Sequence, residues 1–494
     1  MVSAGEERPR IGIERVRHVH LVAIAGVGMA ALAGMLKQRG LRVTGSDEAI
    51  YPPMSNVLAR LGIPVMEGYS AAHLNPRPDL VVIGNKVTRQ NAEVQAVLAA
   101  GLPYVSLPEA LGELFIAGKQ SLVVAGTHGK TTSTAMLARV LERAGADPSV
   151  MVGGESLDLG GNFKLGNGRY FVVEGDEYDS AFFDKGPKFL HYRPDAVILT
   201  AVEFDHADVY GDLAAVKAAF RRLVALLPAH APLVVAHGFP HALEVANAAG
   251  QARVVTFGTA PEAEWQVTDV CDRNGWLTMA VRHRGRREGE LMLRMPGAIN
   301  ALNALGVYAL TRALGFDHQA IAAGLAQYSG VARRQEVVGE FRGVTLVDDF
   351  AHHPTAVAGT LAAMRSRYPG RRLWAVFEPR SNTSRRRVFQ RDYVDALARA
   401  DRIIISGVVQ KESDVVAAED LFSPEQLVAD LTARRVDARA LEASHAIASA
   451  LAAEVRAGDV VVLMSNGAFG GLRGKLVDAL SPIGGRMEPH SELR

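Results

Sequence analysis

Residues 122–132, with the sequence LVVAGTHGKTT, decide the fold: an apolar run leads through a glycine-rich turn into a helical pattern. A strand, a tight turn and a helix N-terminus in this order form a phosphate cradle. Backbone N–H groups converge on the anion, and the helix dipole adds positive charge. Lys130 can neutralise phosphate and the Thr131 hydroxyl can bind Mg²⁺. The loop is shorter than the common G-x-x-x-x-G-K-[ST] motif, because its first glycine is Gly126. An ordinary strand-to-helix turn is the alternative, and the sequence favours the phosphate site.

Composition limits the classes of protein that remain. A chain of 494 residues is too long for one core, so two to four domains are expected. The net charge of +1 gives no field that would attract nucleic acid or a membrane surface. Cys271 is the one cysteine, which excludes an internal disulfide and fits a reducing compartment. The polar first ten residues lack a signal-peptide core, so we expect a cytoplasmic protein without membrane insertion.

Apolar runs alternate with helical patterns along the chain, which predicts parallel sheets covered by helices. Three α/β domains in series are expected, at residues 1–115, 116–330 and 331–494. A small antiparallel insert is predicted at residues 252–294, where the pattern alternates and turns more often. The predicted strands are 18–24, 43–46, 80–83, 104–105, 122–124, 170–173, 196–200, 233–235, 344–347, 373–377, 402–405 and 460–463.

The first domain carries a dinucleotide-type fingerprint. Gly26 and Gly28 follow the first strand, and Asp47 ends the next one about 20 residues on. Such glycines allow a tight turn and let the backbone approach a pyrophosphate, while the aspartate can bind a ribose hydroxyl. This pattern fits an NAD site as well as a site for another nucleotide diphosphate. An NAD-dependent oxidoreductase is therefore one functional alternative, and glycines that serve helix packing alone are another.

Carboxylates follow two strands of the second domain at the edge where open α/β sheets bind ligands. The segments are Glu174–Asp179 and Glu203–Asp208, the second of which includes His206. With a phosphate loop in the same sheet, Mg²⁺ coordination is the chemical use, because hard cations take oxygen ligands. A solvated acidic loop explains the first segment equally well.

Further polar groups follow later in the chain. Asn300 and Asn303 share one helical face; amides can pair with a base, although a solvated face is the favoured explanation from the residues alone. Residues 333–354 combine arginines suited to a γ-phosphate with carboxylates suited to ribose or metal. Residues 378–384 mix arginine with small donors, a fair site for a carboxylate-bearing substrate. Residues 385–387, three arginines, are interpreted as a solvated helix start.

The order of these motifs resembles the Mur ligase family, the ATP-dependent amide-forming enzymes of the bacterial cell wall, over about residues 18–476. The resemblance implies a Rossmann-like domain for UDP-N-acetylmuramate, a central P-loop ATPase-type domain and a Rossmann-like C-terminal domain that binds the incoming peptide and closes on ATP. The motifs that carry it are HLVAIAGVGM (20–29), GSD (45–47), GTHGKTT (126–132), NALNA (300–304), RRQE (333–336), DDFAHHPT (348–355) and SNGAFGG (465–471).

Within the muramate-using branch of this family, two sister activities compete. One adds free L-alanine; the other reattaches the recovered tripeptide L-alanyl-γ-D-glutamyl-meso-diaminopimelate. Four segments resemble the tripeptide-adding members, whose activity we therefore expect, with small-molecule substrates and a monomer or weak homodimer. These segments are residues 174–199, 203–210, 377–383 and 464–471.

The resemblance also implies roles for single residues. Lys130, Glu174, His206 and His352 would be catalytic, and Thr131, Glu174 and His206 would hold Mg²⁺. The implied ATP-binding residues are Gly126, Thr127, His128, Gly129, Lys130, Thr131, Thr132, Asn300, Asn303, Arg334 and Asp349. The implied UDP-sugar site is Gly26, Gly28, Ser46 and Asp47, and the implied peptide site is Arg380, Asn382 and Thr383.

Three positions depart from the family pattern. Phe220 stands where several members carry a carbamylated lysine, as is general in the muramate-using branch, so metal charge must be balanced otherwise. Ile299 replaces the histidine that usually precedes the adenine motif, and Ala201 replaces an asparagine before the second acidic edge. None of the three removes a phosphate-loop or metal-binding group.

Overall fold

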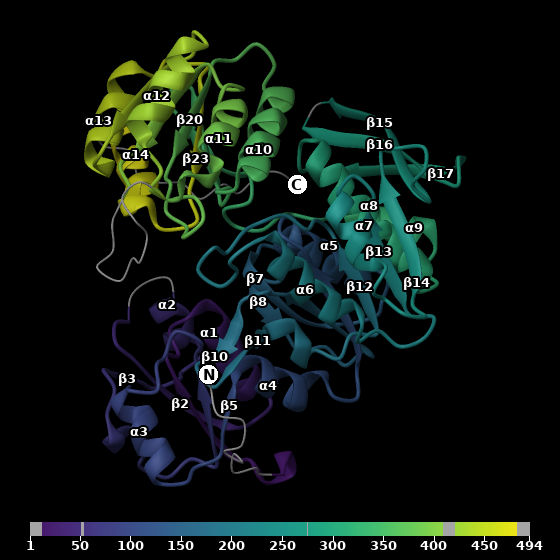
Figure 1. Cartoon of the computed structure of the whole chain (residues 1–494), viewed down its shortest axis with the longest axis vertical. Coiled ribbons are helices and arrows are strands. Elements are labelled where there is room, and N and C mark those ends of the chain that lie inside the picture. The colour runs from purple at the N-terminus through teal and green to yellow at the C-terminus, as the bar shows by residue number, and fades with distance from the viewer. Residues whose placement is uncertain (1–11, 51–53, 274, 409–419, 482–494) are drawn as a thin grey trace.

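The computed structural model describes residues 12–50, 54–273, 275–408 and 420–481. The polar N-terminus that argued against a signal peptide lies outside them. Three α/β units follow one another along the chain, each built on its own main sheet (Figure 1). This confirms the predicted three-domain α/β architecture with mostly parallel sheets. No helix in the described part of the chain is both long and apolar enough to span a membrane.

The N-terminal unit is a five-stranded parallel sheet in the order β3-β2-β1-β4-β5. Its first strand is fully buried and leads through the glycine turn into the first helix, as expected for a Rossmann-like domain. The strands are β1 His18–Val22, β2 Arg42–Asp47, β3 Val65–Glu67, β4 Leu80–Ile83 and β5 Tyr104–Ser106. The helices are α1 Val27–Gln38, α2 Met54–Arg60, α3 Ala92–Ala99 and α4 Leu107–Leu111.

The central unit is a ten-stranded sheet in the order β17-β16-β15-β14-β13-β12-β6-β9-β7-β8. Its inner strands are parallel and apolar, because helices cover both faces. The strands are β6 Gln120–Ala125, β7 Ser149–Ser156, β8 Gly161–Lys164, β9 Tyr170–Gly175, β12 Ala196–Leu199, β13 Pro232–Ala236, β14 Arg253–Gly258, β15 Trp265–Arg273, β16 Trp276–His283 and β17 Arg286–Leu293, beside the separate hairpin β10 Asp179–Ala181 and β11 Asp184–Pro187. The helices are α5 Lys130–Arg143, α6 Leu213–Val224, α7 Pro240–Ala246, α8 Ala298–Ala313 and α9 His318–Ala326.

The C-terminal unit is a six-stranded sheet in the order β18-β19-β23-β20-β21-β22, parallel except for the edge strand β18. The strands are β18 Glu336–Phe341, β19 Val344–Asp349, β20 Leu373–Phe377, β21 Arg402–Ser406, β22 Asp437–Leu441 and β23 Val460–Met464. The helices are α10 Pro354–Arg367, α11 Gln390–Leu397, α12 Pro424–Ala433, α13 Ser444–Glu454 and α14 Leu472–Leu480.

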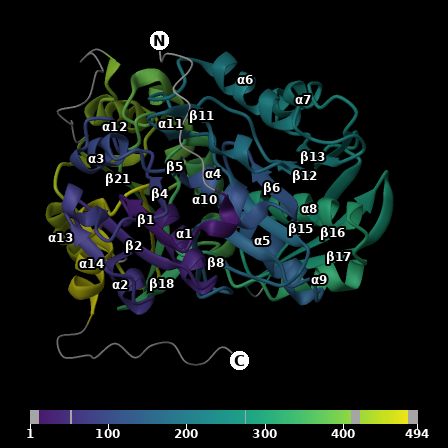
Figure 2. The same ribbon diagram turned by 90° about the horizontal axis from the view of Figure 1, so that it is seen from below.

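The units meet at the loops that follow their strands. Helix α1 of the first unit lies beside β7 and β8 of the central sheet (Figures 1 and 2). Gly34 of α1 has no room for a side chain, because a Cβ would lie 2.3 Å from the Phe163 ring of β8. Helix α10 of the third unit contacts α8 and β15 of the second. The central unit, which carries the loop after β6, therefore contacts both the first and the third unit.

Candidate active site

The phosphate loop joins β6 to α5, and two of its positions require glycine. Gly126 has a φ of +130°, and a Cβ there would lie 2.3 Å from the Thr200 hydroxyl. Gly129 has a φ of +79°, and a Cβ would lie 2.5 Å from Oδ1 of Asn303. Side chains are therefore excluded on both sides of the turn. The shortened loop is held tightly against β12 and α8.

Lys130 is the first residue of α5 and the centre of a buried charge network. Its Nζ donates to the Gly126 carbonyl at 2.6 Å and to Oε1 of Glu177 at 2.9 Å. Burial opposes its charge, but the carboxylates of Glu177, Asp176 and Glu174 keep the pKa of Lys130 above its ordinary value. The lysine is thus held as a cation facing the loop.

Glu177 is the site residue that sequence reasoning missed. It is 2% exposed and its Oε1 also lies 2.9 Å from Nε2 of His206. Burial alone would raise the pKa of Glu177, but Lys130 and His206 outweigh it and hold the pKa below the ordinary value. The sequence shows it within the acidic segment after β9, but its burial between Lys130 and His206, which singles it out, comes from tertiary contacts that the sequence does not show. Glu177 therefore couples the lysine to the histidine.

Glu174, Thr131 and Arg334 join the acidic edge, the helix and the third unit. The Thr131 hydroxyl donates to Oε1 of Glu174 at 3.0 Å, and Arg334 donates to the same hydroxyl oxygen at 3.0 Å. The other Glu174 oxygen accepts the backbone N–H of Gly153 at 2.8 Å. Arg334 also lies over the Phe350 ring at 4.5 Å. These three side chains place the Arg334 guanidinium, which can bind an anion, next to the Thr131 and Glu174 oxygens, which can bind a cation.

A cavity of about 310 Å³ opens above these groups between the second and third units. Its wall includes most of the residues predicted for catalysis and ATP binding: Thr127, His128, Gly129, Lys130, Thr131, Thr132, Glu174, His206, Asn300, Asn303, Arg334, Asp349 and His352. Gly126, at the start of the loop, is not part of the wall. The structure therefore brings side chains that are far apart in the sequence, from residue 127 to residue 352, together around one cavity.

Asn300 and Asn303 of α8 contradict the solvated-face interpretation, since they are 3% and 7% exposed. The Asn300 amide donates to the Pro296 carbonyl at 2.8 Å and to Gln335 at 2.9 Å. Asn303 donates to Oδ1 of Asn300 at 3.3 Å. Ile299, which replaces the family histidine, lines the same part of the cavity. This part combines amides with apolar surface, a combination suited to a purine ring.

Asp349 ends β19 and is almost fully buried in the cavity wall. Its carboxylate accepts the backbone N–H groups of Gln335 and Ala351, both at 2.7 Å, and the Thr360 hydroxyl at 3.2 Å. Burial nevertheless raises the pKa of Asp349 above the ordinary value. These bonds fix the β19 loop that carries the following histidines.

His352 faces Asp205 across the boundary between the units. Its Nε2 lies 3.6 Å from Oδ2 of Asp205, which is 3% exposed. Burial works against ionisation, yet the histidine contacts hold the pKa of Asp205 well below the ordinary value. An ionised carboxylate beside an imidazole can orient it as a proton acceptor.

The predicted UDP-sugar residues form a separate turn, away from the cavity wall. Asp47 accepts the backbone N–H of Ala25 at 2.8 Å, which closes the glycine turn between β1 and α1. Ser46 is fully buried in β2. Gly28 lies between the first two units, because a Cβ there would lie 3.1 Å from Leu107 of α4 and 3.6 Å from the Met151 methyl of β7. Gly26, Gly28, Ser46 and Asp47 thus lie at the junction of the first two units.

The predicted peptide residues lie in the loop after β20, outside the cavity wall. Arg380 packs against Gly467, whose position has no room for a Cβ. Asn382 accepts a hydrogen bond from Arg385 at 2.7 Å, and the Thr383 hydroxyl accepts the backbone N–H of Ala207 at 3.1 Å. Arg385 is 3% exposed, so the interpretation of residues 385–387 as a solvated helix start is wrong at its first arginine.

The position of the family's carbamylated lysine is filled by packing. Phe220 of α6 is fully buried and stacks on Phe189 with ring centroids 5.6 Å apart. A charged group has no room there. The negative charge near the loop comes instead from the carboxylates of Glu174, Asp176 and Glu177, which surround Lys130.

Three family models match consecutive segments of the chain. They are described as the catalytic domain of the Mur ligase family, over residues 18–119, the Mur ligase middle domain, over 124–311, and the Mur ligase glutamate ligase domain, over 333–467.

Individual proteins match most of the chain. A UDP-N-acetylmuramate–L-alanyl-γ-D-glutamyl-meso-2,6-diaminoheptandioate ligase of Escherichia coli (strain K12) is 37% identical over 477 residues, 94% of this chain and 98% of the relative. A UDP-N-acetylmuramate–L-alanine ligase of Arthrobacter sp. (strain FB24) is 39% identical over 407 residues, 82% of this chain and 84% of the relative. The crystal structure of a murein peptide ligase from Psychrobacter arcticus 273-4 matches with a TM-score of 0.69 and 32% identity, over 94% of this chain and 98% of that one.

Proposed function

Because this chain belongs to the Mur ligase family, we propose that it joins L-alanyl-γ-D-glutamyl-meso-diaminopimelate to UDP-N-acetylmuramate. The enzyme is an ATP-dependent ligase that forms an amide bond, and it returns recovered cell-wall peptide to peptidoglycan synthesis. The observation that carries this proposal is the cavity in which Lys130, Glu174 and Arg334 converge from two units.

The first step places two anions together, because the muramate carboxylate must attack the γ-phosphate of ATP. Lys130 at the loop and Arg334 from the third unit reduce the repulsion between them and hold the reacting groups in line. The amides of Asn300 and Asn303 receive the adenine at the other part of the cavity. The product of the step is a muramyl acyl phosphate, and ADP is released from the attacked phosphorus.

Mg²⁺ fits the residues at the acidic edge. The Thr131 hydroxyl and the Glu174 carboxylate lie 3.0 Å apart and face the cavity, and both are hard oxygen donors. His206, 2.9 Å from Glu177, would serve a second ion. The ion would supply charge neutralisation at the phosphates, and Glu174 and Thr131 would fix its position against the loop.

The second step needs a neutral amine from the alanine of the tripeptide. Nδ1 of His352 donates to the Phe350 carbonyl at 3.0 Å, so Nε2 accepts the proton that this amine loses, and Asp205 at 3.6 Å stabilises the cation that forms. The amine attacks the acyl carbon, and the tetrahedral intermediate collapses to the amide with phosphate as the leaving group.

The other two substrates bind to residues of the first and third units. The UDP-sugar is held by Gly26, Gly28, Ser46 and Asp47, and the peptide is bound by Arg380, Asn382 and Thr383. The reaction needs small-molecule substrates and is expected of a monomer or weak homodimer in the cytoplasm.

A phosphate-release assay tests the proposal. The enzyme is mixed with ATP, Mg²⁺ and UDP-N-acetylmuramate, and either the tripeptide or L-alanine is added. Rapid release with the tripeptide alone supports the proposal. The 39% identity to an L-alanine ligase makes L-alanine addition the second candidate, and release with L-alanine alone would establish it. NADH binding without any phosphate release would favour the oxidoreductase alternative.

A further inference from the structure

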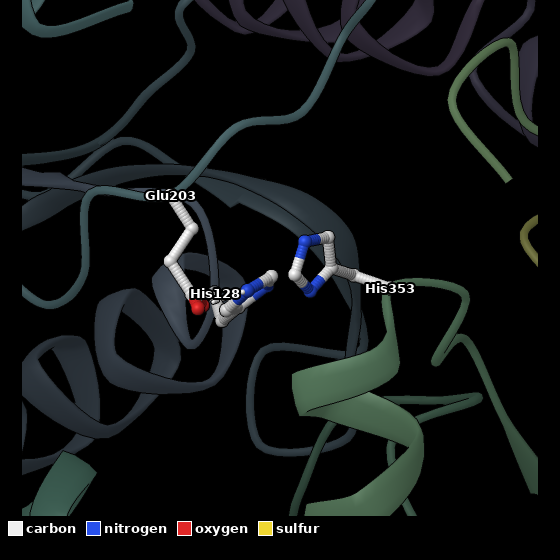
Figure 3. A group of neighbouring side chains, drawn as sticks. All are labelled: His128, Glu203 and His353. Carbon is white, nitrogen blue, oxygen red and sulfur yellow. Dashed lines mark hydrogen bonds and ion pairs between the residues drawn. The ribbon is translucent and has the colours of Figure 1, made fainter. Parts of the chain in front are cut away.

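Three side chains meet at the boundary between the second and third units; one of them, His128, also lines the ATP cavity, and the reaction above gives the other two no role. His128 belongs to the phosphate loop, Glu203 follows β12, and His353 immediately precedes α10 (Figure 3). Each offers one ligand atom, and these atoms lie within 4.8 Å of one another. We call these three residues the His–Glu–His cluster.

The cluster is held in place by its neighbours. His128 Nε2 lies 2.7 Å from Oε2 of Glu203, and the other carboxylate oxygen accepts the Thr355 hydroxyl at 3.1 Å. Thr127 fixes the Glu203 backbone, because its hydroxyl accepts the Glu203 N–H at 2.9 Å. The two imidazole rings face each other with centroids 4.5 Å apart (Figure 3). Two loops and a helix start therefore position the three side chains together.

His353 has an unused nitrogen inside this arrangement. The residue is 5% exposed, and its Nε2 is buried without a hydrogen-bond partner among the described residues. Its Nδ1 accepts the Thr355 N–H at 3.3 Å, so Nε2 can offer its lone pair to a ligand when the ring proton moves to Nδ1 and this bond is given up. A buried polar group without a partner destabilises the folded protein. A ligand that pairs with Nε2 removes that cost.

The donor set identifies the class of ligand. Two imidazoles and one carboxylate form the three-residue set that zinc takes in sites with an open fourth position. Neutral imidazole suits zinc and similar transition metals, whereas Mg²⁺ prefers an all-oxygen set. Glu203 is 29% exposed, which leaves an entrance for the ion from solvent. We propose that the His–Glu–His cluster binds one divalent transition-metal ion, with zinc as the best match.

Such an ion would link the phosphate loop to the third unit. His353 belongs to the third unit, while His128 and Glu203 belong to the second, so the coordination bonds would hold the two units together beside the ATP cavity. Mg²⁺-supported turnover requires ADP to leave between these units. Zinc at the cluster would therefore slow turnover. This consequence rests on the proposed function, whereas the binding itself does not.

Equilibrium dialysis of the full chain against Zn²⁺, with Mg²⁺ in large excess, tests the binding. One tightly held zinc is expected in the unmodified protein, with at least a tenfold loss of affinity in His353→Ala and in Glu203→Gln. His206→Ala is the matched control, because it removes a histidine from the proposed Mg²⁺ edge and leaves the cluster intact. Equal zinc binding by the unmodified protein and His353→Ala overturns the proposal, as does loss of zinc in His206→Ala alone.

Two further measurements keep the result interpretable. Circular dichroism checks the fold of each variant, and His353→Gln replaces His353→Ala if the alanine variant fails to fold. In the phosphate-release assay, added zinc should slow the unmodified enzyme several-fold more than His353→Gln. If the protein holds zinc but shows no ligase activity, the proposed function fails while the metal site stands. If activity is present and zinc binding is absent, the metal site fails alone.

Discussion

At the scale of single residues, the phosphate loop depends on a glycine whose backbone conformation and close neighbours both disfavour a side chain. Gly129 has a φ of +79°, where L side chains cost about 1 kcal/mol or more, and a Cβ would meet Asn303 at 2.5 Å. Gly129→Ala should raise the KM for ATP at least tenfold, because the loop must move away from the adenine amides. Steady-state kinetics at varied ATP concentration measure this effect.

Gly145→Ala is the matched control for Gly129→Ala. Its φ of +76° carries the same backbone strain, but nothing lies within 4 Å of the added Cβ. The strain should cost Gly145→Ala a similar amount of stability, measured by thermal unfolding, and its KM for ATP should stay that of the unmodified protein. Equal KM values for the two variants would show that the contact with Asn303 does not matter.

His353 gives the protein a defined response to acid. Burial, with the nearby His128, lowers the pKa of His353 to about 3. The unfolded chain binds this proton near pH 6.5, so acidification favours unfolding over the window between about 6.5 and 3. Between pH 7 and pH 5 this group should remove about 2 kcal/mol of stability, because 1.5 pKa units are worth that amount.

Denaturation of the unmodified protein and His353→Gln, both with a chelator to remove metals, checks this response. As the pH falls from 7 to 5, the unmodified protein should lose about 2 kcal/mol more of its free energy of unfolding than His353→Gln does. NMR titration of the histidine rings gives the same answer directly. A His353 resonance that titrates near pH 6.5 would contradict the prediction.

At the scale of elements, a buried contact between two polar side chains ties the first strand to the third helix. His20 of β1 and Glu93 of α3 are both fully buried, with Nε2 2.5 Å from Oε1. Glu93→Ala leaves the His20 ring without its hydrogen-bond partner in the core and should cost about 1–3 kcal/mol. Glu113→Ala, which removes one half of an exposed pair with Arg193, should cost less than about 1 kcal/mol. Thermal unfolding of the two variants compares them, and equal shifts would exclude a stabilising role for the buried pair.

Buried parallel strands were predictable because their apolar runs are continuous. Leu80–Ile83 and Leu373–Phe377 coincide with β4 and β20. The antiparallel segment at 252–294 exists as β15, β16 and β17, but it extends the central sheet through β14 and is not a separate insert. Edge strands such as β18 went unpredicted, since half-exposed residues leave a weak pattern.

Residues of the candidate site were predictable where a polar side chain with a clear chemical use stands at the end of a strand or soon after it. Lys130, Thr131 and Glu174 follow β6 or end β9, so sheet topology alone brings them together. Burial of Asn300 was not predictable, because it depends on Gln335 from a distant segment that covers the amide. Glu177 was hidden for the same reason: three carboxylates stand beside it in sequence, and tertiary contacts select it.

At the scale of the whole molecule, the site is complete only when the second and third units meet. Arg334 reaches Thr131 at 3.0 Å, and the Thr355 hydroxyl reaches Glu203 at 3.1 Å. The loop after β20 makes a further contact, because Thr383 accepts the N–H of Ala207 at 3.1 Å. Further polar contacts cross the same boundary, among them Asn300 to Gln335 at 2.9 Å and Arg386 to the Ala207 carbonyl at 3.0 Å. The third unit must break such contacts if it separates to exchange nucleotide.

Thr383→Val should shift the balance toward separated units. Valine keeps the shape but cannot accept the Ala207 N–H, so one of the contacts that hold the units together is lost. Small-angle X-ray scattering should show a larger radius of gyration for the variant than for the unmodified protein without ligands. A non-hydrolysable ATP analogue with UDP-N-acetylmuramate should restore the smaller value, because ligand contacts with both units replace the lost bond.

Thr432→Val, at an exposed position of α12, is the control and should scatter as the unmodified protein does. If the ligands leave the scattering of all three proteins unchanged, closure of the third unit on ATP is excluded.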